Sequence, residues 1–172
     1  MAAIYHESDL LVAEVLRGGV LDGLEPAHLA GVASALTFEA RRTGDEPPLP
    51  RQAPVVERLA MVDALAAGLR SDERRVGLRR TRRPDSGLAR AVVAWASGGT
   101  LDAVLRDAEV APGDFVRNVR QIIDLVRQIG QVAEVPGTRD SAELAVALLR
   151  RGVVGADDPA ALGSAPGDPS PS

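Results

Sequence analysis

The 172-residue sequence contains no cysteine and no lysine, and only four of its residues are aromatic. The absence of cysteine excludes disulfides, thiol nucleophiles, iron–sulfur clusters and cysteine-based zinc sites. The absence of lysine excludes the phosphate-binding loop of many ATPases, Schiff-base chemistry and pyridoxal attachment. The two histidines, His6 and His28, have no third ligand at a metal-binding spacing. We therefore predict no metal site, no cofactor and no catalytic residue within this chain.

Long apolar runs are also lacking, because no stretch approaches the roughly 18 apolar residues that cross a bilayer. The first residues carry Glu7 and Asp9 and do not resemble a signal peptide. We expect a cytoplasmic protein without membrane contact. The net charge of −4 means that the whole chain does not attract nucleic acid, so any basic surface must be local.

Alanine, valine and leucine dominate what is present, with 28, 20 and 20 copies. Alanine and leucine lose little side-chain freedom in a helix, and no segment shows the alternating pattern of a strand. The sequence predicts an all-α bundle of about seven helices with one long central helix. The predicted helices cover residues 8–17, 26–42, 55–70, 87–97, 100–105, 113–134 and 140–151.

Several local signals mark the ends of these helices. Ser8, Ser86 and Thr100 are predicted N-caps, and Arg41 and Arg42 suit the C-terminal end of the second helix. The four prolines within 43–54 predict an extended loop. From Gly155 onward the chain is rich in Ala, Asp, Gly, Pro and Ser. We therefore predict one helical domain over 1–154 and a disordered tail over 155–172.

The helix predicted over 113–134 has the clearest amphipathic pattern. Its apolar positions recur at three- and four-residue spacing, and the opposite face is polar. The candidate nucleic-acid-binding residues on that polar face are Arg117, Arg120, Gln121, Asp124 and Gln128. Arg120 and Asp124 are expected to pair along the helix, which leaves Arg117 free to contact phosphates or bases. The alternative is an ordinary solvated face with weak salt bridges.

Residues 70–90 form the most basic stretch, with eight arginines against three carboxylates. Such a stretch can follow a phosphate backbone. It has almost no interleaved aromatic residues, which weakens a base-stacking role. The alternative is a solvated and partly disordered connector.

Seven segments of the sequence are distinctive: I-Y-H-E-S-D-L-L-V-A-E-V-L-R at 4–17, G-L-E-P-A-H-L-A at 23–30, A-L-T-F-E-A-R-R at 35–42, R-P-D-S-G-L-A at 83–89, W-A-S-G at 95–98, G-D-F-V-R-N-V-R-Q-I-I-D-L-V-R-Q-I at 113–129 and L-L-R-R-G-V-V at 148–154. Together these segments resemble the DSHCT domain, the C-terminal helical module of Ski-like superfamily-two RNA helicases and their bacterial HelY-type relatives. They occur in the family's order and span about 150 residues.

This resemblance implies that 113–134 is the ratchet helix, which faces the nucleic acid that passes through the motor. Arg117 and Arg120 match basic positions of the family and Asp124 an acidic one, whereas Gln121 stands where relatives often carry a basic residue. The implied partners are single-stranded RNA, or alternatively DNA, and the RecA-like core domains.

The resemblance also implies where the chemistry resides. ATP and Mg²⁺ would bind the motor domains, whose motifs this chain lacks, so we expect a fragment of an ATP-dependent helicase. One alternative is a stand-alone helical module that binds a protein partner. Another is a stand-alone RNA-binding protein that uses the arginines of 70–90.

Overall fold

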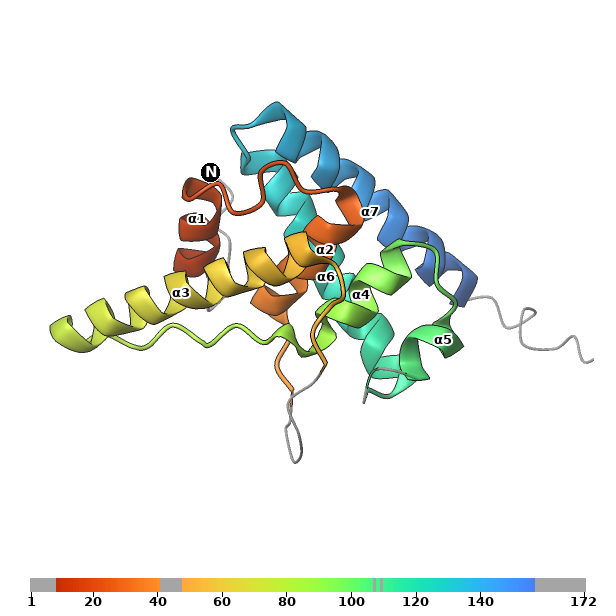
Figure 1. The fold of residues 1–172 in the computed structure, drawn as a ribbon, viewed down its shortest axis with the longest axis horizontal. Helices are drawn as coiled ribbons and strands as arrows, with labels where there is room; N and C mark the ends of the chain where they lie inside the picture. Colours follow the sequence, from red (N-terminus) through yellow and green to blue (C-terminus); the bar gives the residue numbers. More distant parts are fainter. Residues whose placement is uncertain (1–8, 41–47, 107, 109, 157–172) are drawn as a thin grey trace, which may run out of the picture.

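The computed structural model describes residues 9–40, 48–106, 108 and 110–156 (Figure 1). Within these residues the fold is all-α, as predicted, and contains no strand. Its elements are α1 (Asp9–Arg17), α2 (Pro26–Thr37), α3 (Ala53–Val76), the 3₁₀ turn η1 (Ser86–Leu88), α4 (Ala89–Ala96), α5 (Leu101–Arg106), α6 (Pro112–Val132) and α7 (Pro136–Ala156). None of the described helices is long and apolar enough to cross a membrane. The predicted cap Ser8, Arg41, Arg42 and residues 157–172 of the predicted tail lie outside the described residues, whereas residues 155–156 of that tail belong to α7.

Helix α2 occupies the middle of the bundle and contacts α3, α4, α6 and α7. Every residue from Leu29 to Thr37 is buried, including small ones that carry little apolar surface. Gly31 allows α4 to approach closely, because a Cβ atom at this position would lie 2.4 Å from Cγ2 of Val93. Helix α6 keeps one exposed face, and α3 is longer, with 24 residues against 21. The long central helix predicted over 113–134 is therefore not confirmed.

Helices α4, α6 and α7 meet at Trp95 and Phe115. Trp95 and Phe115 pack edge to face with their ring centroids 5.5 Å apart. The Trp95 indole Nε1 donates a hydrogen bond of 3.2 Å to the Leu149 carbonyl of α7. Figure 1 shows α6 and α7 joined by a short connection at one end of the bundle. These contacts hold the buried side of α6 in place.

The end of α2 differs from the prediction, since the helix stops at Thr37 and does not continue to residue 42. Phe38 takes an extended backbone conformation, with ψ at 143°, and its ring is buried. The Ala35 carbonyl accepts a hydrogen bond of 3.0 Å from the backbone N–H of Asp85. A partner distant in sequence therefore satisfies a carbonyl that another helical turn would have used.

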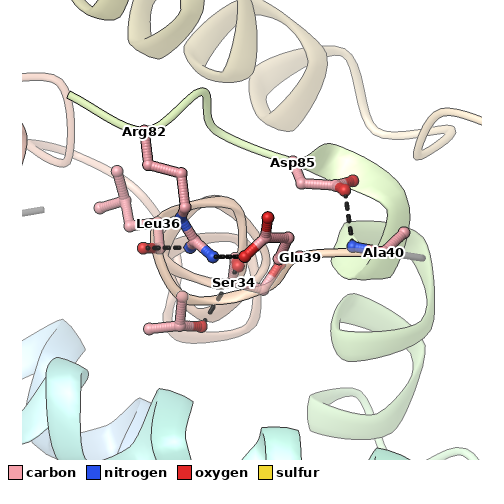
Figure 2. Close-up of polar contacts among 7 residues, drawn as sticks. Ser34, Leu36, Glu39, Ala40, Arg82 and Asp85 are labelled. Atoms are coloured by element: carbon pink, nitrogen blue, oxygen red, sulfur yellow. Dashed lines mark hydrogen bonds and ion pairs between the residues drawn. The ribbon is translucent and has the colours of Figure 1, made fainter. Parts of the chain in front are cut away.

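Figure 2 shows how the segment before η1 fastens to this end of α2. The Arg82 guanidinium donates to the Leu36 carbonyl at 3.2 Å and pairs with Glu39 at 3.1 Å. The Asp85 carboxylate accepts a hydrogen bond of 2.9 Å from the Ala40 N–H. Both side chains bridge parts of the chain that are more than 40 residues apart.

Two predicted caps have different outcomes. The η1 turn is capped by Asp85, whose carboxylate accepts from the Gly87 N–H at 2.9 Å, and not by Ser86. The Asp85 carboxylate accepts hydrogen bonds both from this turn and from the residues after α2, which favours it over the Ser86 hydroxyl as the cap. Thr100 caps α5 as predicted, since its hydroxyl accepts from the Ala103 N–H at 3.4 Å.

Helix α3 continues six residues beyond its predicted end and leaves the bundle. Its buried apolar residues all lie between Val55 and Ala66. Gly77, with φ at 71°, ends the helix, and the chain then returns beside it to η1 (Figure 1). We call residues 70–85 the arm. The arm is helical as far as Val76, and most of its side chains are exposed, in keeping with a solvated stretch.

Candidate nucleic-acid interface

Helix α6 has a buried side and an exposed side because its apolar residues recur with the helical period. Pro112 occupies the first turn, where its missing N–H costs no hydrogen bond, and Asp114 lies near the positive end of the helix dipole. The buried side consists of Phe115, Val119, Ile122, Ile123, Leu125, Val126 and Ile129. It packs against α2 and α7.

The five candidate residues lie together on the exposed side. Arg117, Arg120, Gln121 and Asp124 are exposed, and Gln128 is partly buried. At 3.6 residues per turn, their positions fall within a sector of about 100° around the helix axis. We call this set the polar α6 face. A strand lying along it would meet guanidinium, amide and carboxylate groups in succession.

The ion pairs on this face correct one prediction. Arg117 is not free, because its Nη2 lies 2.8 Å from Oδ1 of Asp114. Asp124 pairs with Arg127, with 3.4 Å between Oδ1 and Nη1. The partner of Arg117 is Asp114, one turn toward the N-terminus, and the prediction considered only the pairing of Arg120 with Asp124. The Arg117 side chain is 69% exposed, and exposed pairs contribute about 0–1 kcal/mol, so a phosphate can replace the carboxylate.

A shallow groove between α6 and α7, which was not predicted from the sequence, borders the polar α6 face. Arg127 and Gln131 line it from α6, and Arg139 and Glu143 line it from α7. Arg139 also donates to the Ala133 carbonyl at 2.9 Å and the Glu134 carbonyl at 3.2 Å, which satisfies the end of α6. Helical periodicity within 113–134 cannot reveal a residue that the next helix contributes.

The described residues contain no group of three or more histidine, aspartate or glutamate side chains that could hold a metal ion. The His28 side chain is largely buried and its Nδ1 lies 4.0 Å from the Glu25 carboxylate. His6 lies outside the described residues. The interface candidates are therefore the polar α6 face and the basic arm.

One buried carboxylate organises the arm. Glu73 is only 8% exposed and accepts hydrogen bonds from the Thr81 hydroxyl and, at 2.5 Å, from the Thr81 N–H. The Thr81 hydroxyl, the Thr81 backbone N–H and the nearby Arg70 all favour the charged carboxylate and lower the pKa of Glu73 below its ordinary 4.5, although burial opposes them. The carboxylate thereby holds the returning segment against α3.

This arrangement predicts a pH dependence of folding stability. Because the pKa of Glu73 is lower in the folded state, its contribution is present above pH 4.5 and is lost as the pH falls from 4.5 through the lowered value. Glu73→Gln should lose this part of the dependence. Urea unfolding of both proteins between pH 3 and 6 measures it. The account of the arm is wrong if the two free energies of unfolding fall in parallel over that range.

The fold and its surfaces define an all-α domain that presents one long polar helix face and a separate basic arm, without a described metal site. The sequence comparisons then identify the family. The chain belongs to the DSHCT (NUC185) domain family, whose match covers residues 1–157.

The relatives found among curated proteins include helicases. The chain is 40% identical over 171 residues to the probable helicase HelY of Mycobacterium tuberculosis H37Rv and 42% identical over 168 residues to that of Mycobacterium leprae; each match covers 91% of this chain and 18% of the relative. It is 26% identical over 156 residues to the ATP-dependent RNA helicase mtr4 of Schizosaccharomyces pombe, covering 84% of this chain and 14% of the relative. The chain thus spans less than a fifth of the length of these relatives.

Proposed function

We propose that this chain is the C-terminal helical domain of an ATP-dependent RNA helicase, and that its polar α6 face contacts the strand the helicase moves. The DSHCT match over residues 1–157 carries the proposal, and the names of the relatives support it. The partners are single-stranded RNA and RecA-like core domains. The chain has no lysine and hence no phosphate-binding loop, so ATP and Mg²⁺ are assigned to the motor.

The role proposed for the domain is to hold the strand while the motor pulls it. Arg117 and Arg120 can donate to phosphate oxygens or stack on bases, and the amides of Gln121 and Gln128 can donate or accept. Asp124 is negatively charged, as a phosphate is, and forms an ion pair with Arg127. Such contacts are weak and largely independent of sequence, which suits a strand that must keep moving.

Replacing Arg117 and Arg120 together by alanine should weaken binding of single-stranded RNA. Each phosphate contact contributes about 0.7 to the slope of log affinity against log salt, so the slope should fall by about 1.4 in magnitude. Fluorescence anisotropy at 50 and 150 mM salt measures both affinity and slope. The net charge of −4 predicts a Kd of micromolar or weaker at the higher salt.

A matched control is the double substitution of Arg51 and Arg150, which are exposed arginines outside both candidate surfaces. It removes the same charge and should change the slope much less. Equal affinities for the wild type and the Arg117/Arg120 variant would refute the proposed strand contact.

The alternative of a stand-alone protein-interaction module requires a contiguous apolar surface. The exposed large apolar side chains are instead distributed over several elements. They are Leu10, Leu49, Met61, Val76, Leu78, Val132, Val135 and Leu144.

A further inference from the structure

A groove lies between α3 and the segment that returns beside it. Its lining includes the small side chains of Ala66 and Ala67 of α3 and Ser86 of η1, together with Asp63 of α3 and Pro84. Three arginines stand around these small residues: Arg70 and Arg74 from α3 and Arg83 from the returning segment. We call this site the arm groove. Within the described residues, neither Arg74 nor Arg83 has a carboxylate at ion-pair distance.

The arm has a positive balance of charge in a chain that is negative as a whole. Residues 70–85 contain seven arginines and three carboxylates, a balance of +4, whereas the whole chain is −4 and the rest is therefore −8. Two of the three carboxylates are used inside the fold, because Glu73 binds Thr81 and Asp85 binds Ala40 and Gly87. Arg82 is held by Glu39 and Leu36. An anion approaching the molecule is therefore drawn to the arm groove.

The two α3 arginines are one helical turn apart, so their side chains extend on the same side of the helix. A guanidinium group can donate two parallel hydrogen bonds to one phosphate, and Arg83 faces these two arginines from the opposite wall. The small side chains between them allow a backbone to approach closely. The groove lining has no aromatic or large aliphatic side chain, so it lacks the apolar pocket that anchors a protein partner.

We propose that the arm groove binds the phosphodiester backbone of a single-stranded nucleic acid. This contact goes beyond the proposed function, because it requires neither the polar α6 face nor a motor. On the polar α6 face Arg117 lies next to the carboxylate of Asp114 and Asp124 adds a negative charge, whereas the arm has a large positive excess. The arm groove therefore supplies more of the salt-dependent binding of this chain than the polar α6 face does.

Replacing Arg70, Arg74 and Arg83 together by alanine tests the proposal. At 50 mM salt we expect a rise of at least tenfold in the Kd for a single-stranded RNA of mixed sequence, and a fall of about 2 in the salt slope. The Arg51/Arg150 double variant is the control for charge, and circular dichroism confirms that each variant folds. The same measurement on DNA of the same sequence shows which nucleic acid binds more tightly.

The absence of cysteine allows the two surfaces to be examined separately. Ala67→Cys and Gln121→Cys, both at exposed positions, each provide one thiol for an environment-sensitive fluorophore. RNA should change the fluorescence at position 67, in the arm groove, whatever happens at position 121. A change at 67 without one at 121 would mean that the proposed α6 contact fails while the arm-groove contact holds.

Two outcomes would overturn the proposal. One is unchanged RNA affinity in the folded triple variant together with a silent label at position 67. The other is a poly-glutamate peptide of matched charge that binds the labelled groove as tightly as RNA, which would assign the groove to an acidic protein partner.

Discussion

Phe115→Ala should lower the free energy of unfolding by about 3–5 kcal/mol, the range for removing a buried phenylalanine side chain. Phe115 is fully buried at the start of α6 and packs edge to face on Trp95. Its removal leaves a cavity between α4 and α6, and the Trp95–Leu149 hydrogen bond restricts how far Trp95 can move to fill it. Urea unfolding followed by circular dichroism measures the loss.

Phe115→Leu is the matched control, because leucine retains much of the apolar volume and should cost clearly less than alanine. Val116, next in sequence but partly exposed, provides a second comparison through Val116→Ala. A loss below about 1 kcal/mol for Phe115→Ala would show that the contact between α4 and α6 is not as described.

Gly31→Ala should destabilise the fold by about 1–3 kcal/mol, even though alanine is the better helix former. The added Cβ would lie 2.4 Å from Cγ2 of Val93, which is buried and stiff because it is β-branched. Either α4 must move away from α2 or Val93 must leave its preferred rotamer. Thermal and urea unfolding measure the effect.

The same substitution at Gly68 is the control, since a Cβ there meets no atom within 4 Å. Gly68→Ala lies within α3 and should stabilise the protein by about 0.5–1 kcal/mol. Combining Gly31→Ala with Val93→Ala should recover part of the loss by removing the obstructing methyl group. Equal effects at positions 31 and 68 would contradict the close approach of α2 and α4.

Elements governed by local signals could be predicted from the sequence. The apolar seam and Pro112 placed α6 within two residues of its observed ends, and the hydroxyl of Thr100 identified the start of α5. The same periodicity placed the five candidate residues on one face. The sequence pattern is sufficient to predict α6 because its buried residues recur with the period of the helix itself.

Features that depend on distant partners could not be predicted. Helix α2 ends early because Asp85 and Arg82 satisfy its last carbonyls, and α3 extends because Glu73 holds Thr81 beside it. The central position of α2 could not be predicted, because its small residues contribute little to a hydrophobic pattern. On the polar α6 face, Arg117 has a carboxylate three residues before it, and only side-chain geometry shows that this pair forms.

Photo-crosslinking tests most directly whether the polar α6 face contacts the strand. Single-stranded RNA carrying photoreactive bases would be irradiated with the chain, digested with trypsin and analysed by mass spectrometry. Cleavage after arginine yields peptide 121–127, which carries Gln121 and Asp124. We expect adducts on this peptide in the wild type, and fewer adducts on peptide 107–127 of the Arg117/Arg120 variant, which replaces it because the substitutions remove two cleavage sites. Adducts elsewhere in the chain with none between residues 114 and 131 would contradict the account.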